Sequence, residues 1–474
     1  MRTETVLRFW TALIALLLVT ACGKGEQQQQ VPSSAVPVTA GTFVQLFEWH
    51  WPDIATECED FLSPAGYAAV QISPPNEHIT GPAWWTRYQP VSYKLESRSG
   101  TRAEFADMVT RCAAAGVGIY ADAITNHMAG FEAGVGVAGS AYSEYNYPVP
   151  YEYDDFHHCG RYDDDRIRDY QDLWEIQNCQ LGSLDDLDTG KPSVQKKIAA
   201  YLNDLISLGV TGFRMDAVKH VAHDEVTAIL QQVEGDPFVF QEVIDHGGEP
   251  IDATNYVENG MVTEFKFPPV IVEAFEYGNL DALTSFSSHP GWLPADRAIV
   301  FVDNHDLQRG HAGGAVIVNY KDGARYNLAV AFMLAYPYGY PMVMSSYRFE
   351  DDGQGPPGSS PLDEDNGCGH DWVCEHRRPA IANMVKFRQA TGGTEVVNWQ
   401  IVDDKIVSFG RGDIGHVVIN ISELPVSLEL TTSLPAGDYV DMISGGGNVA
   451  VGEDGLATVN VAPQSAVALL NPPR

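Results

Sequence analysis

Short apolar runs alternate with amphipathic helical stretches along most of the chain, from about residue 42 to 390. Eight of these runs have the length and composition of buried strands. They are residues 42–47, 68–72, 117–121, 210–216, 238–242, 262–267, 298–302 and 342–346. The clearest intervening helix spans residues 193–208, and Pro192 and Gly209 suit its two ends. Eight strands separated by helices predict an α/β fold, a parallel (β/α)₈ TIM barrel, with its active site at the carboxyl ends of the strands.

Two stretches break this rhythm. Residues 128–188 are rich in Gly, Tyr, Asp and Asn and show few helical periods. Such a long insertion after the third strand predicts an irregular subdomain with a function of its own. From 391 to 474, short alternating strands separated by Gly-rich turns predict a C-terminal antiparallel β-sandwich domain. The barrel itself is therefore expected to occupy residues 42–127 and 189–390.

The first 22 residues have the basic start and short apolar run of a signal peptide, too short to span a bilayer. The segment ends at Cys22 in a Val-Thr-Ala-Cys sequence that resembles the bacterial lipobox, in which the Cys becomes the lipidated first residue. Gly23, rather than Asp, follows it, which favours the outer membrane. Residues 23–41 are polar and Pro/Ser-rich and predict a tether. The alternative is an ordinary signal peptide with an incidental Cys and a secreted product.

Composition and charge indicate which kinds of molecule the protein can bind. The chain has 474 residues, 45% hydrophobic and 19% charged, as expected of a mostly globular protein. Its 63 acidic and 29 basic residues give a net charge of -34, which repels nucleic acid but leaves neutral sugars unaffected. Solubility is the simplest reason for this acidity, and adaptation to salt is the alternative.

The cysteine count agrees with export. Six cysteines remain after Cys22, and an even number in an exported chain indicates disulfides. The residues themselves leave fifteen pairings open. The six are Cys58, Cys112, Cys159, Cys179, Cys368 and Cys374.

Candidate chemistry gathers at the ends of the predicted strands. Arg214 and Asp216 are two residues apart in one strand, so their side chains share a face, and the Arg would keep the Asp ionised as a nucleophile requires. Glu242 ends the next strand, where apolar neighbours would raise its pKa and suit it to act as an acid. Taken alone, the first pair is also compatible with a structural ion pair, and Glu242 with a solvated loop residue.

Two further carboxyl groups occupy similar places. Asp306 follows one predicted strand and Asp122 follows another, and each alone could cap a turn. With Asp216 and Glu242, they place four carboxyl groups at four strand ends, accompanied by His127, His220 and His305. Because unpaired buried carboxyl groups are costly, this coincidence favours a catalytic site.

An aromatic cluster follows the second predicted strand. Trp84, Trp85 and Tyr88 lie within five residues. Flat aromatic rings stack on the apolar faces of pyranose rings, so these residues are candidates for binding a sugar chain. Packing in the core is the alternative for the two tryptophans.

These segments resemble the four motifs of the α-amylase family, glycoside hydrolase family thirteen. Their order and spacing agree, and the resemblance extends from about Phe43 to the C-terminus. The matching segments are residues 122–127, 212–220, the segment around Glu242, and 301–306. Further segments resemble the animal-type α-amylases, which also occur in some bacteria: residues 70–78, 84–90 and 344–348.

The resemblance implies endo-hydrolysis of α-1,4 bonds in starch and glycogen with retention of configuration. It implies Asp216 as nucleophile, Glu242 as general acid and base, and Asp306 as the group that favours the distorted transition state. It also implies a set of side chains that contact the sugar: Trp84, Trp85, Tyr88, Gln89, Asp122, His127, Arg214, Lys219, His220 and His305.

A calcium ion and a disulfide pattern are implied as well. Asn126, Asp186 and the backbone carbonyls of Gln177 and His220 match the family's calcium ligands, all of them oxygen donors. Gln177 stands where animal-type members usually carry Arg, a change that spares a backbone ligand. The ion would join the 128–188 insertion to the barrel. The implied disulfides are Cys58–Cys112, Cys159–Cys179 and Cys368–Cys374.

The chloride site of animal-type members is incomplete in this chain. Arg214 and Asn304 match two of its ligands, but Met342 occupies the third, basic position. A thioether carries no positive charge, and an anion with one cationic partner is poorly compensated. We therefore expect activity that does not depend on chloride.

Two other functions compete with the α-amylase interpretation. A transglycosylase or a maltooligosaccharide-forming enzyme would share the four motifs. A surface lipoprotein that binds glycans without cleaving them would be expected to lack one of Asp216, Glu242 and Asp306, and all three are present. We expect a monomer that contacts a membrane through its lipid anchor alone.

Overall fold

The computed structural model describes residues 40–130, 133–149, 151–288, 290–313 and 316–471. The predicted signal peptide, Cys22 and nearly all of the predicted tether lie outside these residues. Among the described residues, no helix has the length and apolar character needed to cross a bilayer.

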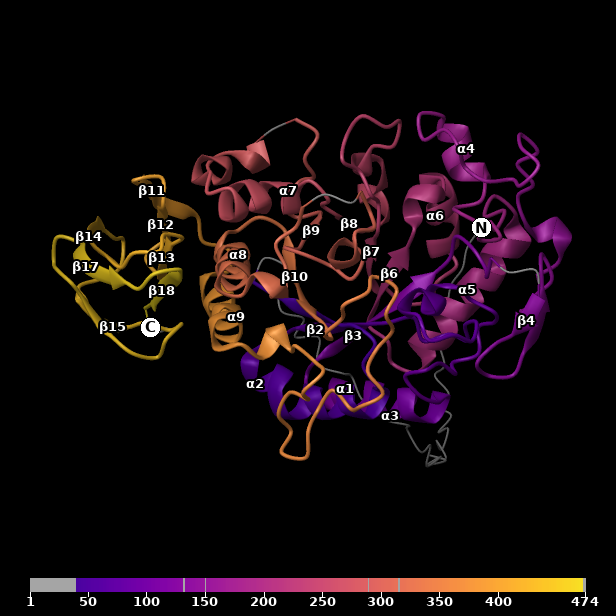
Figure 1. The fold of residues 1–474 in the computed structure, drawn as a ribbon, viewed down its shortest axis with the longest axis horizontal. Coiled ribbons are helices and arrows are strands. Elements are labelled where there is room, and N and C mark those ends of the chain that lie inside the picture. The colour runs from indigo at the N-terminus through magenta and orange to yellow at the C-terminus, as the bar shows by residue number, and fades with distance from the viewer. Residues whose placement is uncertain (1–39, 131–132, 150, 289, 314–315, 472–474) are drawn as a thin grey trace, which may run out of the picture. The chain divides into compact units, whose positions relative to one another are not determined.

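Eight parallel strands close into a barrel in which spatial neighbours follow one another along the chain (Figure 1). The predicted (β/α)₈ barrel is therefore confirmed. The strands are β1 (Phe43–Leu46), β2 (Ala69–Ile72), β3 (Gly118–Ile124), β6 (Gly212–Asp216), β7 (Phe238–Gln241), β8 (Met261–Thr263), β9 (Ala298–Val300) and β10 (Tyr340–Ser345).

Two strand boundaries differ from the prediction in ways that affect the site. Strand β3 continues to Ile124, so Asp122 lies inside the strand opposite Arg214 rather than after it. The predicted strand 262–267 ends at Thr263, and helix α7 (Phe267–Ile271) begins where the sequence turns to two prolines. Proline suits the first turn of a helix, where no backbone N–H is needed.

Helices surround the barrel, and their ends follow local sequence signals. The predicted helix 193–208 is observed as α5 (Pro192–Ser207), with Pro192 in its first turn. Helix α3 (Arg102–Ala114) begins with a capping box between Thr101 and Glu104. The others are α1 (Trp51–Glu57), α2 (Ser63–Ala65), α6 (His223–Leu230), α8 (Ala324–Ala335) and α9 (Pro379–Thr391).

The barrel interior holds an apolar layer beneath the strand ends. Phe43 packs against Phe240 with ring centroids 5.4 Å apart and against Tyr340 at 4.9 Å. Met342 belongs to the same cluster and is 4% exposed. This packed layer forms a floor for the polar side chains above it.

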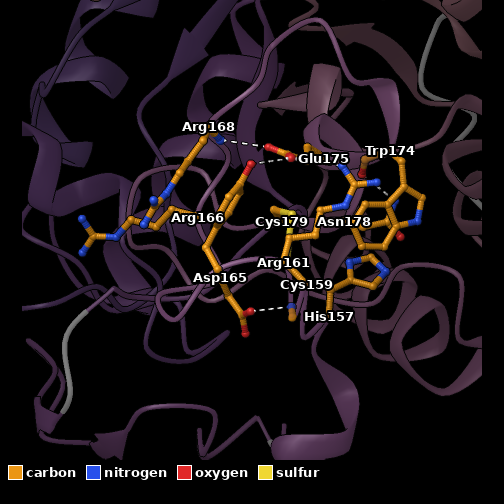
Figure 2. Close-up of a disulfide and its surroundings, with 12 residues drawn as sticks. His157, Cys159, Arg161, Asp165, Arg166, Arg168, Trp174, Glu175, Asn178 and Cys179 are labelled. Atoms are coloured by element: carbon orange, nitrogen blue, oxygen red, sulfur yellow. Dashed lines mark hydrogen bonds and ion pairs between the residues drawn. A yellow bond between two sulfur atoms is a disulfide. The ribbon is translucent and has the colours of Figure 1, made fainter.

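The insertion between β3 and α5 contains little regular structure. Its described residues hold a hairpin of β4 (Ala133–Val135) and β5 (Ala141–Ser143), which the sequence did not predict, a 3₁₀ helix at Tyr153–Asp155 and the short α-helix α4 (Leu173–Asn178). The Cys159–Cys179 disulfide ties α4 to the preceding loop (Figure 2). Glu175 in α4 accepts hydrogen bonds from the backbone N–H groups of Arg168 and Asp169. These bonds fix the loop that precedes α4.

The C-terminal strands form two antiparallel sheets, as predicted, and α8 and α9 pack against β13 and β18 (Figure 1). One sheet has β11 (Val396–Val402), β12 (Ile406–Arg411), β13 (Gly415–Asn420) and β18 (Ser465–Leu470). The other has β14 (Val426–Thr431), β17 (Leu456–Val461), β16 (Asn448–Val451) and β15 (Gly437–Val440). The sequence did not predict β15 and β16, whose four residues each bury at most two side chains.

Three disulfides join the six cysteines in the pattern that the family resemblance implies. Cys58–Cys112 links the helices after β1 and β2, and Cys368–Cys374 closes a short loop after β10. The pairing is thus reduced from fifteen possibilities to one.

Candidate active site

One buried guanidinium joins three carboxyl groups at the carboxyl ends of β3, β6 and β7. Arg214 Nη1 lies 2.7 Å from Asp122 Oδ1 and 2.5 Å from Asp216 Oδ1. Its Nη2 lies 2.5 Å from Glu242 Oε1. The predicted Arg214–Asp216 pair is therefore present, and the same Arg also holds Glu242 and Asp122. Asp306 lies close enough to the charges of Glu242 and Arg214 for both to shift its pKa.

Burial governs the pKa values of this cluster. It raises the pKa of Glu242, and the charge of Asp216 adds to this shift while Arg214 opposes it. Burial also raises the pKa of Asp216 against the opposing charge of Arg214. It raises the pKa of Asp306 to about 8 and that of Asp122 to about 7. One guanidinium cannot neutralise four buried carboxylates, so part of the cluster holds a proton near neutral pH.

The loop after β6 supplies a backbone donor to Glu242. Ala217 has a φ of 53°, a left-handed conformation that is unusual for a residue with a side chain. In this conformation its N–H donates to Glu242 Oε2 at 3.1 Å. Backbone strain of this kind is typical of functional sites.

The predicted aromatic residues come from a short 3₁₀ helix, Trp84–Tyr88, and differ in exposure. Trp84 is 4% exposed and donates its Nε1–H to the backbone oxygen of Asp352 at 2.7 Å. Trp85 is 38% exposed, so part of its ring is accessible to solvent. The Tyr88 hydroxyl donates a hydrogen bond to Asp122 Oδ2 at 2.9 Å. Its ring stacks on that of His305, with ring centroids 5.1 Å apart.

Of the three predicted histidines, His127 and His305 are buried and contact polar groups of the protein. His127 Nε2 lies 3.0 Å from the backbone oxygen of Tyr88, and burial lowers the His127 pKa to about 4. His305 Nδ1 lies 3.1 Å from the Gln45 amide, and its Nε2 lies 3.6 Å from Asp306. Burial also lowers the His305 pKa, so both rings are neutral at pH 7.

Most of the predicted site residues line a cavity of about 590 Å³. Its lining includes every predicted catalytic and sugar-contacting residue except Asp122 and Arg214, which lie beneath Asp216 and Tyr88. Gln89 lines it while its side-chain oxygen accepts the N–H of Gly130 at 3.1 Å.

The sequence interpretation missed several lining residues. Lys219, which it did predict, pairs with Glu249 at 2.5 Å and lies over the ring of Tyr170, 5.3 Å from its centroid. Tyr170 lies in the irregular insertion, where no periodicity marks it. Further missed residues include Ile244, His246 and His311. Their positions just after β7 and β9 were the available signal, because loops at those strand ends form the site.

The predicted calcium ligands lie in two pairs of contacting segments, each joining the insertion to the barrel. The backbone oxygen of Asn126 accepts the N–H of Leu187, next to Asp186. His220 Nδ1 lies 2.9 Å from the backbone oxygen of Ile176, next to Gln177. Asp186 is 2% exposed, and burial raises its pKa to about 7.

These donors fit a hard cation such as Ca²⁺. They offer one carboxylate, one amide oxygen and two backbone carbonyls. Among the described residues, no group of three or more His, Cys, Asp and Glu side chains is arranged to hold a metal. The ion would thus depend on neutral oxygens for most of its ligands. His157 lies 2.7 Å from Asp186 Oδ2 and would have to share that carboxylate with it.

The surroundings of Met342 are apolar. Met342 lies opposite Phe43 in the barrel register, within the apolar layer. Asn304 Oδ1 accepts the N–H of Leu307 at 2.8 Å. Arg214 already faces three carboxyl groups, so an anion beside it would find no uncompensated positive charge.

A parallel eight-stranded barrel whose strand ends carry clustered carboxyl groups in an aromatic-lined cleft is typical of glycoside hydrolases. Comparison with known proteins identifies the family. Residues 84–246 match the model of the α-amylase catalytic domain, and residues 397–471 match that of the α-amylase C-terminal all-β domain. The chain belongs to the α-amylase family and is an endo-acting glycoside hydrolase.

Its similarity to individual proteins extends over most of the chain. It is 44% identical to α-amylase 1B of Homo sapiens and to pancreatic α-amylase of Sus scrofa, each alignment covering 89% of this chain and 92% of the relative. Among solved structures, α-amylase I of Eisenia fetida matches with a TM-score of 0.87 and 38% identity, over 91% of this chain and 97% of that one. A variant of the Eisenia fetida enzyme has been solved in complex with maltohexaose.

Proposed function

We propose that this protein cleaves internal α-1,4 bonds of starch-like glucans by double displacement, with Asp216 as nucleophile and Glu242 as general acid and base. The observation that carries the proposal is the double contact of Arg214, at 2.5 Å from each of these two carboxyl groups. Contact with one planar guanidinium keeps the two groups close together. Retaining glycosidases need such a pair, about 5–5.5 Å apart.

In the first step, Asp216 attacks the anomeric carbon while Glu242 donates a proton to the departing glycosidic oxygen. The products are a glycosyl ester on Asp216 and a free sugar hydroxyl. The raised pKa of Glu242 supports its role as the acid. Contact with Arg214 favours the ionised form of Asp216.

In the second step, Glu242 takes a proton from water, and the resulting hydroxide displaces Asp216. The Ala217 N–H and Arg214 stabilise the ionised Glu242 that this step needs. Asp306 would bind sugar hydroxyls and favour the distorted ring. The other predicted contacts would hold the glucan along the cavity, and Trp85 is the most exposed ring among them.

A product time course on soluble starch tests this activity against the related enzyme classes. We expect viscosity to fall before much reducing sugar appears, with a mixture of short maltooligosaccharides. Release of a single maltooligosaccharide, or products longer than the starting chains, would instead identify a maltooligosaccharide-forming enzyme or a transglycosylase.

We further propose that Ca²⁺ binds Asn126, Asp186 and the carbonyls of Gln177 and His220, and fixes the 128–188 insertion to the barrel at residues 42–127 and 189–390. A metal that binds the native state alone stabilises it by mass action. Excess EGTA should lower Tm by about 5 °C or more, and activity with it, and added Ca²⁺ should restore both.

The matched control for calcium is Asp186→Asn. Its Tm should start lower and respond little to EGTA, because the strongest ligand is already gone. Differential scanning calorimetry measures both proteins. A wild-type Tm that EGTA leaves unchanged would refute the calcium site.

Activity should be independent of chloride, because Met342 brings no charge and Arg214 is already shared by three carboxyl groups. The measurement is hydrolysis in dialysed acetate buffer, titrated with NaCl at constant ionic strength. We expect less than about a twofold change in rate. Saturable activation of severalfold would contradict this expectation.

We propose an exported enzyme that acts as a monomer and is tethered by residues 23–41 to a lipid on Cys22. The lipobox-like sequence supports the anchor, and the three disulfides support export. Cys22→Ala should move the activity from the membrane fraction to the soluble fraction. Intact mass spectrometry of the mature protein checks the anchor directly, and a mature Cys22 without a diacylglyceryl adduct would exclude it.

A further inference from the structure

The segment at residues 310–313 follows the Asp306 turn and forms part of the wall of the catalytic cavity. Three of its residues, 311–313, line the cavity. The His311 N–H donates to the backbone oxygen of Asp306 at 3.0 Å, so the segment begins directly at the turn that carries this carboxyl group. The ring of His311 lies edge-on to Trp84, with ring centroids 5.6 Å apart. One end of the segment is therefore fixed.

The backbone of segment 310–313 does not favour its observed shape. Gly310, Ala312 and Gly313 have φ values of 73°, 55° and 114°, all in the left-handed region. Ala312 carries a Cβ, so this conformation is costly for it. The two glycines fit their angles but are free to adopt many others. A contact from outside the segment is needed to hold it against the cavity.

His246, in the loop after β7, supplies such a contact. Its Nε2 lies 2.8 Å from the backbone oxygen of Ala312, 66 residues away along the chain. A carbonyl oxygen only accepts hydrogen bonds, so the ring donates to it from Nε2. A Cβ added to Gly313 would lie 2.5 Å from the same Nε2, which shows how closely the ring and the segment approach. His246 and the segment thus meet across the wall of the cavity that both of them line.

The loop that carries His246 is itself held firmly. The adjacent carboxylate of Asp245 is buried, pairs with Lys266 at 2.8 Å and accepts the N–H of Gly247 at 2.7 Å. The ring of His246 also lies edge-on to the buried ring of Phe265, with centroids 5.8 Å apart. The donor is therefore in place before any substrate binds, and its hydrogen bond to the segment needs no further ordering.

We infer that His246 is a positioning residue that holds segment 310–313 in the shape that completes the cavity wall. This inference rests on the proposed function. A wall that is already in shape binds the substrate without first having to be ordered, so the His246 hydrogen bond strengthens substrate binding.

The reacting groups have supports that do not depend on His246. Arg214 contacts Asp216 and Glu242, each at 2.5 Å. In the Asp306 turn, the buried Arg309 donates from Nη1 to the backbone oxygen of His305 at 2.8 Å. Loss of the His246 hydrogen bond should therefore raise KM and leave kcat nearly unchanged.

The test compares two substitutions of His246. His246→Leu removes the donor, whereas in His246→Gln the side-chain amide nitrogen can take the place of Nε2 and donate to Ala312. Because His246 is exposed, neither change should prevent folding, and thermal unfolding checks this. With maltopentaose and each full-length protein, we expect KM to rise about three- to tenfold in His246→Leu, as for one lost hydrogen bond, with kcat within about twofold. Both constants should stay within about 1.5-fold of wild type in His246→Gln.

A second readout follows the segment itself. Hydrogen–deuterium exchange of the backbone amides at residues 310–313, measured without substrate, should be faster in His246→Leu than in wild type and unchanged in His246→Gln. Unchanged exchange in His246→Leu would overturn the inference, because the segment would then be held without His246.

The kinetic outcomes separate this inference from the proposed function. Wild-type protein that hydrolyses no maltooligosaccharide would overturn the proposed function and the inference with it. Normal hydrolysis with an unchanged KM in His246→Leu would leave that function standing and overturn the role of His246. An equal rise of KM in both variants would also overturn it, because the effect would then belong to the imidazole ring and not to the donated hydrogen bond.

Discussion

Asp216→Asn should lower kcat on soluble starch by at least about a thousandfold, because the amide cannot form the glycosyl ester. Maltooligosaccharide binding should persist, since most of the lining of the 590 Å³ cavity is unchanged. The free energy of unfolding should not fall, because three buried carboxyl groups already share Arg214. Initial rates, equilibrium binding and thermal unfolding of the variant check these three expectations.

The matched control is Asp236→Asn, the same change at an exposed carboxyl group away from the cavity. It should keep wild-type rates. If Asp216→Asn retained activity within about tenfold of wild type, Asp216 would not be the nucleophile.

Glu242→Gln should lower kcat on starch by about 10²- to 10⁴-fold, the range that general acid–base catalysis supplies. The loss should depend on the leaving group. In a maltosyl fluoride, the leaving group is fluoride, which departs without being protonated. The first step on this substrate therefore does not need the proton of Glu242. Pre-steady-state rates of fluoride release by wild type and variant measure this step separately.

The comparison between substrates makes this prediction specific. In Glu242→Gln, the rate of fluoride release should fall much less than the rate of starch hydrolysis. In Asp216→Asn, the two rates should fall equally, because both reactions need the missing nucleophile. Equal losses on both substrates in Glu242→Gln would show that Glu242 positions the substrate and does not donate the proton.

Much of this account could be predicted from local sequence patterns. Eight short apolar runs separated by helical periods specify the barrel, because strand and helix periodicities are properties of neighbouring residues. The Arg214–Asp216 contact follows in the same way from a spacing of two along one strand. Glu242 could be placed at a strand end, and its burial then raises its pKa as expected.

The remaining features depend on how distant segments meet. The contacts of Arg214 with Asp122 and Glu242 arise from the register of β3, β6 and β7, which the closed barrel sets. The hairpin of β4 and β5 has too few buried residues to leave a hydrophobic pattern. Tyr170 reaches the cavity from the insertion by tertiary folding alone.

The central claim is that Asp216 and Glu242 act as a retaining pair, and the anomeric form of the first product tests it most directly. Proton NMR spectra are recorded within the first minutes of maltooligosaccharide hydrolysis, before mutarotation equilibrates the new reducing ends. Two displacements at the same carbon predict that the α-anomer appears first and that the β-anomer follows at the rate of spontaneous mutarotation. Initial release of the β-anomer would mean a single displacement by water and would contradict the account.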